Sequence, residues 1–467
     1  MVRAAGLKEG HGDRVVRRFS RRKLASFASV ALAATSFLFV KSAAAEVTLV
    51  KPQNADGWEF YSSGRLGAFF SWAKGDNMPV AKLGPNGPLY QFKGAGGTGV
   101  GDTDGSAEPI YAPDGITVLG HTQGSVDSQR IRSGFVGNTL GFGLRRKFYQ
   151  ATTAGGFVSI WSNVESTGRR KYFPNFGDVR EGWMKIEGPW GSFLAGKALT
   201  LYNRGATEAN FMYLHGYGLG YPGSISVQGP AAGLIGFGIL ASTFSGGMVY
   251  TTPSLAGLQL AVGVYDPASL VGSRLERTGW VRPEGELTFD QPLSNFGKVH
   301  AYVNATMQKL YVKQDTDKDS ATAKGFGAGL RLELGPVHLA GGLHRGTGLG
   351  LTFALEPSES TYNGLSQLRD SSGFYGMAQV VVGKFDFNLG GGQTRVEPLA
   401  NDLAAVPGTP YPSYSLIRTQ TGLAGAVVFH AASWLHFDVD VMHADFKWTL
   451  KDSQKINFFN AGTVITW

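Results

Sequence analysis

Along most of the chain, apolar and polar residues alternate at every second position. In the segment 324–334, the even positions from Phe326 to Leu334 are all apolar, whereas the odd positions are glycine or charged and end at Glu333. The segment 299–308 shows the same alternation, with apolar residues at the odd positions. Because successive side chains of a strand point to opposite faces, this pattern predicts β-strands with one apolar and one polar face.

Sixteen such segments can be placed between Trp58 and Trp467. They are 58–72, 130–149, 156–165, 178–188, 192–200, 244–252, 257–265, 286–290, 296–312, 324–334, 337–344, 373–382, 385–396, 416–430, 433–448 and 455–467. Short turns rich in Pro, Gly and small residues alternate with long connections, of which 75–129 and 201–234 are the longest. An even number of strands joined in this way predicts an all-β fold, a transmembrane antiparallel up-and-down β-barrel of about 16 strands.

Strand length separates a membrane barrel from a soluble sandwich, which would show the same alternation with its apolar face inward. Alternation over about ten residues suits a tilted membrane crossing, whereas soluble strands average about five or six residues. The last segment alternates up to Trp467, and an aromatic residue there suits the girdle of a barrel at the membrane interface. After residue 45, no apolar run approaches the roughly 20 residues of a spanning helix. We therefore expect residues 46–467 to cross the outer membrane as strands.

A charged and then apolar segment precedes this body. Five Lys and Arg residues between positions 17 and 23 come before the apolar run 24–40, and Ala43–Ala45 supplies small residues for a cleavage site. This order predicts a secretory signal peptide over 1–45. The pair Arg21-Arg22 also fits a twin-arginine signal. The twin-arginine route carries folded proteins, whereas a barrel folds only in its membrane, so we interpret this pair as ordinary signal-peptide charge. The sequence does not decide between the two export routes.

Composition excludes several classes of function. Nine of the 43 Lys and Arg and two of the 35 Asp and Glu lie in residues 1–45, so the body holds 34 basic and 33 acidic residues and no nucleic-acid partner is expected. The chain has no cysteine, which excludes disulfides, zinc ribbons and thiol nucleophiles and suits passage through an oxidising periplasm. Two Gly-x-Gly-x-x-Gly motifs, 94–99 and 218–223, do not open a helix after a strand, so no cofactor is predicted.

Two stretches carry a family resemblance. In 180–197, a strand leads into the turn Trp190-Gly191-Ser192 and the next strand reaches Ala195-Gly196-Lys197; in 249–258, a Tyr-x-x-Pro-x-x-x-Gly-Leu turn joins two strands. Together with the alternating end, these motifs resemble the general porins of Gram-negative outer membranes. The resemblance implies a homotrimer of water-filled barrels in outer-membrane lipid, inserted by the barrel-assembly machinery. It also implies that the third loop, here 201–234, folds into the lumen as a constriction.

The chain departs from that family in three ways. Its first extracellular loop, 75–129, is very long and could act as a lid or a plug. Its last residue is Trp467, where Phe is commoner. The expected constriction loop holds Glu208 as its only acid, which puts a conventional eyelet of acids opposite bases in doubt.

Charged side chains that face the lumen of a pore select among solutes through their electric field. Strand alternation predicts that Arg65, Arg130, Arg132 and Lys185 line the pore. Lys197 is added because the resemblance implies an arginine at its position, and Glu208 because it is the only acid of the expected constriction loop. Each basic residue could equally be a solvated charge at the rim. Since the loop is weakly acidic, this set predicts a mild anion preference.

The expected function is passive diffusion of small hydrophilic solutes and ions through an outer-membrane porin. The alternatives are a substrate-selective outer-membrane channel or a barrel enzyme, for which no Ser/His or Asp/His set can be assembled from the sequence. His436, Asp438 and Asp440 could form an ion site in the lumen, but polar alternation on the inner face explains them without one. No metal site and no catalytic residue are predicted.

Overall fold

The computed structural model describes most of residues 46–467. Outside the described residues lie 1–45, 55–56, 77–81, 85–86, 94–108, 112–117, 122–124, 134–136, 150, 163–177, 212–233, 271–275, 278, 295, 315–316, 356–366, 406–413 and 451. The predicted signal peptide and much of the long first loop therefore lie outside them.

The described chain forms a closed antiparallel β-barrel with sixteen strand positions. In order, these are β2 (Glu59–Asp76), β7 (Ser125–Arg132) with β8 (Asn138–Phe148), β9 (Thr152–Ser162), β10 (Asp178–Gly188), β11 (Gly191–Leu199), β12 (Phe244–Thr251), β13 (Leu258–Tyr265), β15 (Arg282–Pro292), β16 (Lys298–Gln314), β17 (Asp317–Leu334), β18 (Val337–Thr347), β19 (Asp370–Val382), β20 (Phe385–Val396), β21 (Tyr414–Ala432), β22 (Leu435–Trp448) and β23 (Ser453–Thr466). The predicted fold class and strand number are confirmed.

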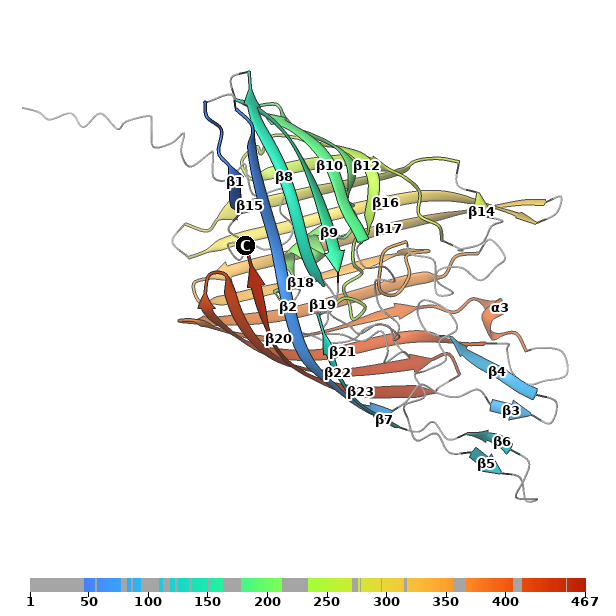
Figure 1. Ribbon diagram of the computed structural model, residues 1–467. Coiled ribbons are helices and arrows are strands. Elements are labelled where there is room, and N and C mark those ends of the chain that lie inside the picture. Colours follow the sequence, from blue (N-terminus) through green and yellow to red (C-terminus); the bar gives the residue numbers. More distant parts are fainter. Residues whose placement is uncertain are drawn as a thin grey trace, which may run out of the picture. The chain divides into compact units, whose positions relative to one another are not determined.

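The barrel closes between its first and last strands, which lie side by side in Figure 1. β2 pairs with β23 from Arg65↔Thr466 to Gly75↔Ile456. On its other edge, β2 pairs first with β8 and then with β7, so these two segments share one position. The backbones of Gly64 and Trp467 exchange hydrogen bonds of 2.7 and 3.0 Å at the end of the seam.

Alternation along the strands separates a lipid-facing surface from an inner surface, as the sequence predicted. On β2, Leu66 is 51% exposed, whereas the neighbouring Arg65 is 4% exposed. On β22, Phe437, Val439 and Val441 are exposed, whereas the even-numbered residues between them are buried. A barrel in lipid needs this arrangement, because its apolar side chains face the acyl chains and every strand edge is paired.

Short elements outside the sixteen positions occupy the barrel ends and the long loops. They are β1 (Val47–Val50), β3 (Lys82–Gly84), β4 (Gly87–Lys93), β5 (Pro109–Tyr111), β6 (Val118–His121), β14 (Glu276–Arg277), α2 (Arg204–Ala209) and α3 (Ala400–Leu403). β1 pairs with the start of β2, beyond the point where β23 ends. β4 pairs in parallel with the start of β21, so part of the long first loop is attached to that strand. In the described part of the chain, no helix is long and apolar enough to cross a membrane.

Candidate pore constriction

The loop between β11 and β12 lies against the inner surface of the barrel. Its described parts, 200–211 and 234–243, are almost fully buried; Leu201, Tyr202, Leu234 and Leu240 have no exposed surface. Hydrogen bonds and ring contacts join them to inward side chains from Glu284 on β15 round to Phe446 on β22. The two described arms of the loop therefore lie inside the barrel instead of standing out from the rim.

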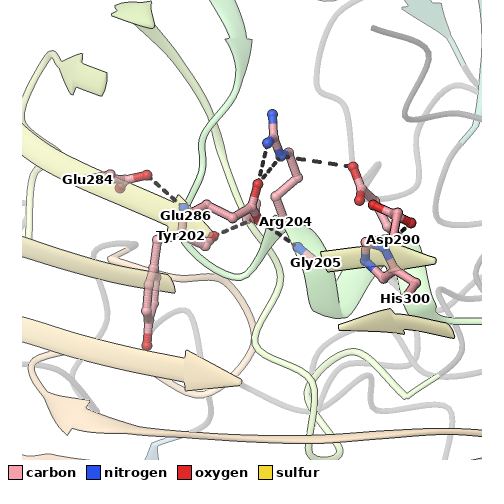
Figure 2. A network of polar contacts seen from close by, with 9 residues as sticks. Tyr202, Arg204, Gly205, Glu284, Glu286, Asp290 and His300 are labelled. Carbon is pink, nitrogen blue, oxygen red and sulfur yellow. Dashed lines mark hydrogen bonds and ion pairs between the residues drawn. The ribbon is translucent and has the colours of Figure 1, made fainter. Parts of the chain in front are cut away.

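The first arm of the loop is held by an ion pair. Arg204, at the start of α2, donates from Nε to Oε2 of Glu286 on β15 at 2.9 Å, and its Nη2 contacts the same oxygen. The backbone N–H of Gly205 donates to Oε1 of Glu286 at 3.2 Å. Figure 2 shows Glu286 between these donors. We call Arg204, Gly205 and Glu286 the loop anchor; it binds both oxygens of a carboxylate that is 2% exposed.

Glu284, on the same strand as Glu286, is a second carboxylate that binds the loop. The N–H of Tyr202 donates to Oε2 of Glu284 at 2.8 Å, and the hydroxyl of Thr306 donates to Oε1 at 3.1 Å. Arg282 lies 2.9 Å from Oε1 of Glu284 and balances its charge. The hydroxyl of Ser242 donates to the carbonyl of Tyr202 at 2.5 Å and so joins the two arms of the loop.

Glycines on the wall allow the first arm to pack closely. A Cβ on Gly205 would lie 2.3 Å from the ring of Tyr302, and a Cβ on Gly329 or Gly342 would lie 2.5 or 2.7 Å from the same side chain. The Tyr302 ring thus lies over two glycines of the wall and against one of the loop. Its hydroxyl is 3.2 Å from that of Tyr375, which fixes its direction.

The second arm lies on the wall formed by β19 to β21. Gly238 has φ +102°, and a Cβ there would lie 2.0 Å from the carbonyl oxygen of Phe374. Its N–H donates to Oγ1 of Thr394 at 2.9 Å, and Gln420 donates to the carbonyl of Gly236 at 2.8 Å. Both the left-handed backbone and the close approach require glycine at position 238.

Glu208 is the one loop acid that the sequence singled out. Its carboxylate lies 3.9 Å from Arg204, one helical turn away, and its side chain is 30% exposed. Burial raises the pKa of Glu208 to about 7, although Arg204 opposes this shift. At neutral pH the loop therefore presents only part of one negative charge to the lumen, so an eyelet based on an acidic loop is weak here.

The predicted basic residues of β2 and β7 lie on paired strands. Arg65 points inward, and its Nη1 donates to the carbonyl of Gly137 at 2.7 Å. Arg132 and Arg130 pair through their backbones with Phe69 and Ser71, both buried residues of β2. The side chains of Arg130 and Arg132 lie outside the described residues.

Lys185 and Lys197 occupy different faces of the barrel wall. The side chain of Lys185 points inward, because the neighbouring Met184 is 64% exposed on the outer face. Its Nζ lies 2.6 Å from Oε2 of Glu187. Lys197 shares the alternation of Phe193, which is 39% exposed, and donates to the carbonyl of Val179 at 2.9 Å. Because the β10–β11 ladder runs without a shift over these positions, Lys197 is placed on the outer face and away from the other predicted residues.

Sequence reasoning missed the residues that hold the loop. Glu284 and Glu286 are inward on β15, and Arg204 was not among the candidates. The sequence holds part of this information, because the charged residues at positions 282, 284 and 286 alternate with Pro283 and Gly285, as on one face of a strand. The pairing with Arg204 was not readable, since no local spacing relates residues that are 82 positions apart.

Inward acids on the later strands form a separate polar network. His430 lies 2.8 Å from Asp386 through Nε2 and 2.7 Å from His436 through Nδ1. His338 and Asn388 both contact Gln379, at 2.7 and 3.0 Å. Among the residues that the structure describes, no group of three or more His, Cys, Asp or Glu side chains could hold a metal ion.

Comparison with known proteins agrees with this architecture. The sequence matches the profile of the Gram-negative porin family over residues 90–405. The fold is similar to the outer membrane channel DcaP of Acinetobacter baumannii (TM-score 0.57, 12% identity, 89% of this chain and 99% of that chain). It is also similar to an anion-selective porin from Comamonas acidovorans (TM-score 0.54, 10% identity, 88% of this chain and 100% of that chain). A search of curated proteins found no match.

Proposed function

Because the chain belongs to the Gram-negative porin family and is therefore an outer-membrane channel for passive diffusion, we propose that the anchored loop between β11 and β12 is its constriction. The observation that carries the proposal is the loop anchor. A loop whose Arg204 is bound to a buried carboxylate of the inner wall stays inside the lumen and narrows it. Small hydrophilic solutes and ions would pass between this loop and the wall opposite, formed by β2, β7 and β8.

The charge selectivity of this pore is proposed to be weak. Of the basic residues predicted to line it, Lys185 is paired with Glu187, and Lys197 lies on the outer face. Arg204 and Arg282 are also matched by wall acids. The mild anion preference would therefore depend on Arg65, Arg130 and Arg132, on the paired strands β2 and β7.

We also propose a homotrimer, on the resemblance and family membership, and a channel without enzymatic activity. The family consists of channels rather than enzymes, and the inner surface as described is built to hold a loop. Purified protein that migrates as a trimer before heating and conducts ions in planar bilayers would support both. A folded barrel that hydrolyses lipid or peptide and shows no conductance would support the alternative of an enzyme.

Ion selectivity provides the test of the basic wall. In a KCl gradient across a planar bilayer, the wild-type channel is expected to show a small reversal potential. Its sign should indicate that chloride is more permeable than potassium. The double variant Arg130→Gln and Arg132→Gln should shift it by about twofold in the permeability ratio toward cations, because two positive charges leave the wall. Lys197→Gln is the matched control and should leave the reversal potential unchanged, since this residue lies on the outer face. An equal shift in both variants would contradict this assignment.

A further inference from the structure

Four of the nine histidines lie on the inner surface at one end of the barrel. They are His300 on β16, His338 on β18, His430 on β21 and His436 on β22, and each is within two residues of the short-turn end of its strand. Each also has the alternation of the inward side chains of its strand. Because the short turns of an outer-membrane barrel face the periplasm, these residues, which we call the histidine row, lie at the periplasmic mouth of the lumen.

Two histidines of the row lie beside partly exposed acids. Nδ1 of His300 is 2.8 Å from Oδ1 of Asp290, and the two side chains are 20% and 60% exposed. His338 pairs through its backbone with Glu333 on β17, whose side chain is 31% exposed, and its Nδ1 lies 2.7 Å from Oε1 of Gln379. These exposed fractions show that water and ions reach this part of the wall.

The other two histidines are joined to each other. Nδ1 of His430 lies 2.7 Å from Nδ1 of His436, and Nε2 of His430 lies 2.8 Å from Oδ2 of Asp386. A hydrogen bond between two imidazole nitrogens needs a proton on one of them and a lone pair on the other. The pair can therefore take up one proton and keep both contacts, whereas a second proton would place two donors against each other. The side chain of His430 is 32% exposed, so this proton can exchange with water in the lumen.

The remaining charged groups around the row come from the loop and from the neighbouring strands. They are Arg204 and Glu208 of the loop, Glu286 of β15, Arg331 of β17, Lys384 of the turn before β20, and Asp438 of β22. Together with Asp290, Glu333 and Asp386, the acids outnumber the bases. While the histidines are neutral, the field at this mouth therefore favours cations, and protonation of the row opposes that field.

We propose that the histidine row makes the ion selectivity of the channel depend on pH, with the preference for anions increasing as the periplasmic mouth becomes acidic. Histidine is the side chain whose charge changes between about pH 5 and pH 8. Acidification adds three positive charges to the wall: one on His300, one on His338, and one shared by His430 and His436. Since these side chains face the lumen, each charge attracts chloride or the carboxylate of a small solute and repels cations.

This inference rests on the proposed channel function, and reversal potentials in a KCl gradient test it. Between about pH 7.5 and about pH 5.5, the ratio of chloride to potassium permeability of the wild type is expected to rise by about twofold. The triple variant His300→Gln, His338→Gln and His430→Gln keeps side chains that form hydrogen bonds but do not titrate, so its ratio should change much less. Glu208 also loses charge in this range, because burial raises its pKa to about 7, but it is present in every variant. The difference between the variants therefore measures the histidine row.

His443→Gln is the matched control. His443 has the outer alternation of β22, and its Nδ1 lies 2.8 Å from Oδ1 of Asn457, so this variant should follow the wild type at both pH values. If the triple variant does not fold, His430→Arg provides the test. It places a permanent charge beside Asp386, so its chloride permeability should already be raised at the higher pH and should change less on acidification.

The outcomes separate this inference from the proposed function. A permeability ratio that responds to pH in the wild type and in His443→Gln, but weakly in the triple variant, supports the role of the histidine row. An equal response in the wild type and in the triple variant, or no response in the wild type, overturns it. A wild-type protein without conductance at either pH instead overturns the proposed function.

Discussion

Replacing Glu286 with Ala is expected to release the constriction loop and widen the channel. Glu286 receives the guanidinium of Arg204 and the N–H of Gly205, and its carboxylate side chain has no exposed surface. The change leaves the largely buried Arg204 without its partner, which costs about 3 kcal/mol or more for a buried pair. In planar bilayers we expect a higher and noisier single-channel conductance, together with a lower unfolding temperature.

Two further variants separate charge from packing at the anchor. Glu286→Gln keeps an acceptor for Gly205 but removes the charge that binds Arg204, so its conductance should lie between those of wild type and Glu286→Ala. Glu187→Ala removes an inward acid of β10 that pairs with Lys185 on the same strand. Its side chain is 29% exposed, so the loss of stability should stay within about 1 kcal/mol and the conductance should be nearly unchanged. Equal conductance in wild type and Glu286→Ala would show that the anchor does not hold the constriction.

The strands were predictable because lipid and lumen impose opposite polarity on alternate residues. Where both faces follow this rule, as in β20 and β22, the predicted segments agree closely with the structure. The segment 286–290 was too short, because β15 begins at Arg282 and its inward charges with Pro283 and Gly285 hide the alternation. The alternation also predicts one continuous strand over 130–149, whereas β7 ends at Arg132 and β8 begins at Asn138.

The interior was much less predictable than the wall. Glycine makes up 67 of 467 residues, but this composition alone does not show what the glycines contact. The structure shows one use of it: Gly329 and Gly342 lie under Tyr302, and Gly392 and Gly422 lie under Phe237 of the loop. Such contacts join residues that are remote in sequence, and no local period encodes them. For the same reason the outer placement of Lys197 became visible only from the register of β10 and β11.

Gly64→Val is expected to disrupt closure of the barrel more than any substitution on the lipid face. A Cβ at position 64 would lie 2.4 Å from the indole of Trp467, whose backbone pairs with that of Gly64 and whose Nε1 donates to Ser62 at 3.2 Å. The ring cannot move away without losing the last pairing of the seam, and a barrel with an open edge in lipid leaves backbone groups unpaired at several kcal/mol each. We therefore expect a loss of at least about tenfold in heat-resistant, folded barrel on unheated gels.

Gly376→Val is the matched control, because a Cβ there meets no atom within 4 Å on the outer face of β19. A similar yield of folded barrel from both variants would show that the seam tolerates displacement of Trp467, and closure would then depend on the longer ladder from Arg65 to Gly75 alone.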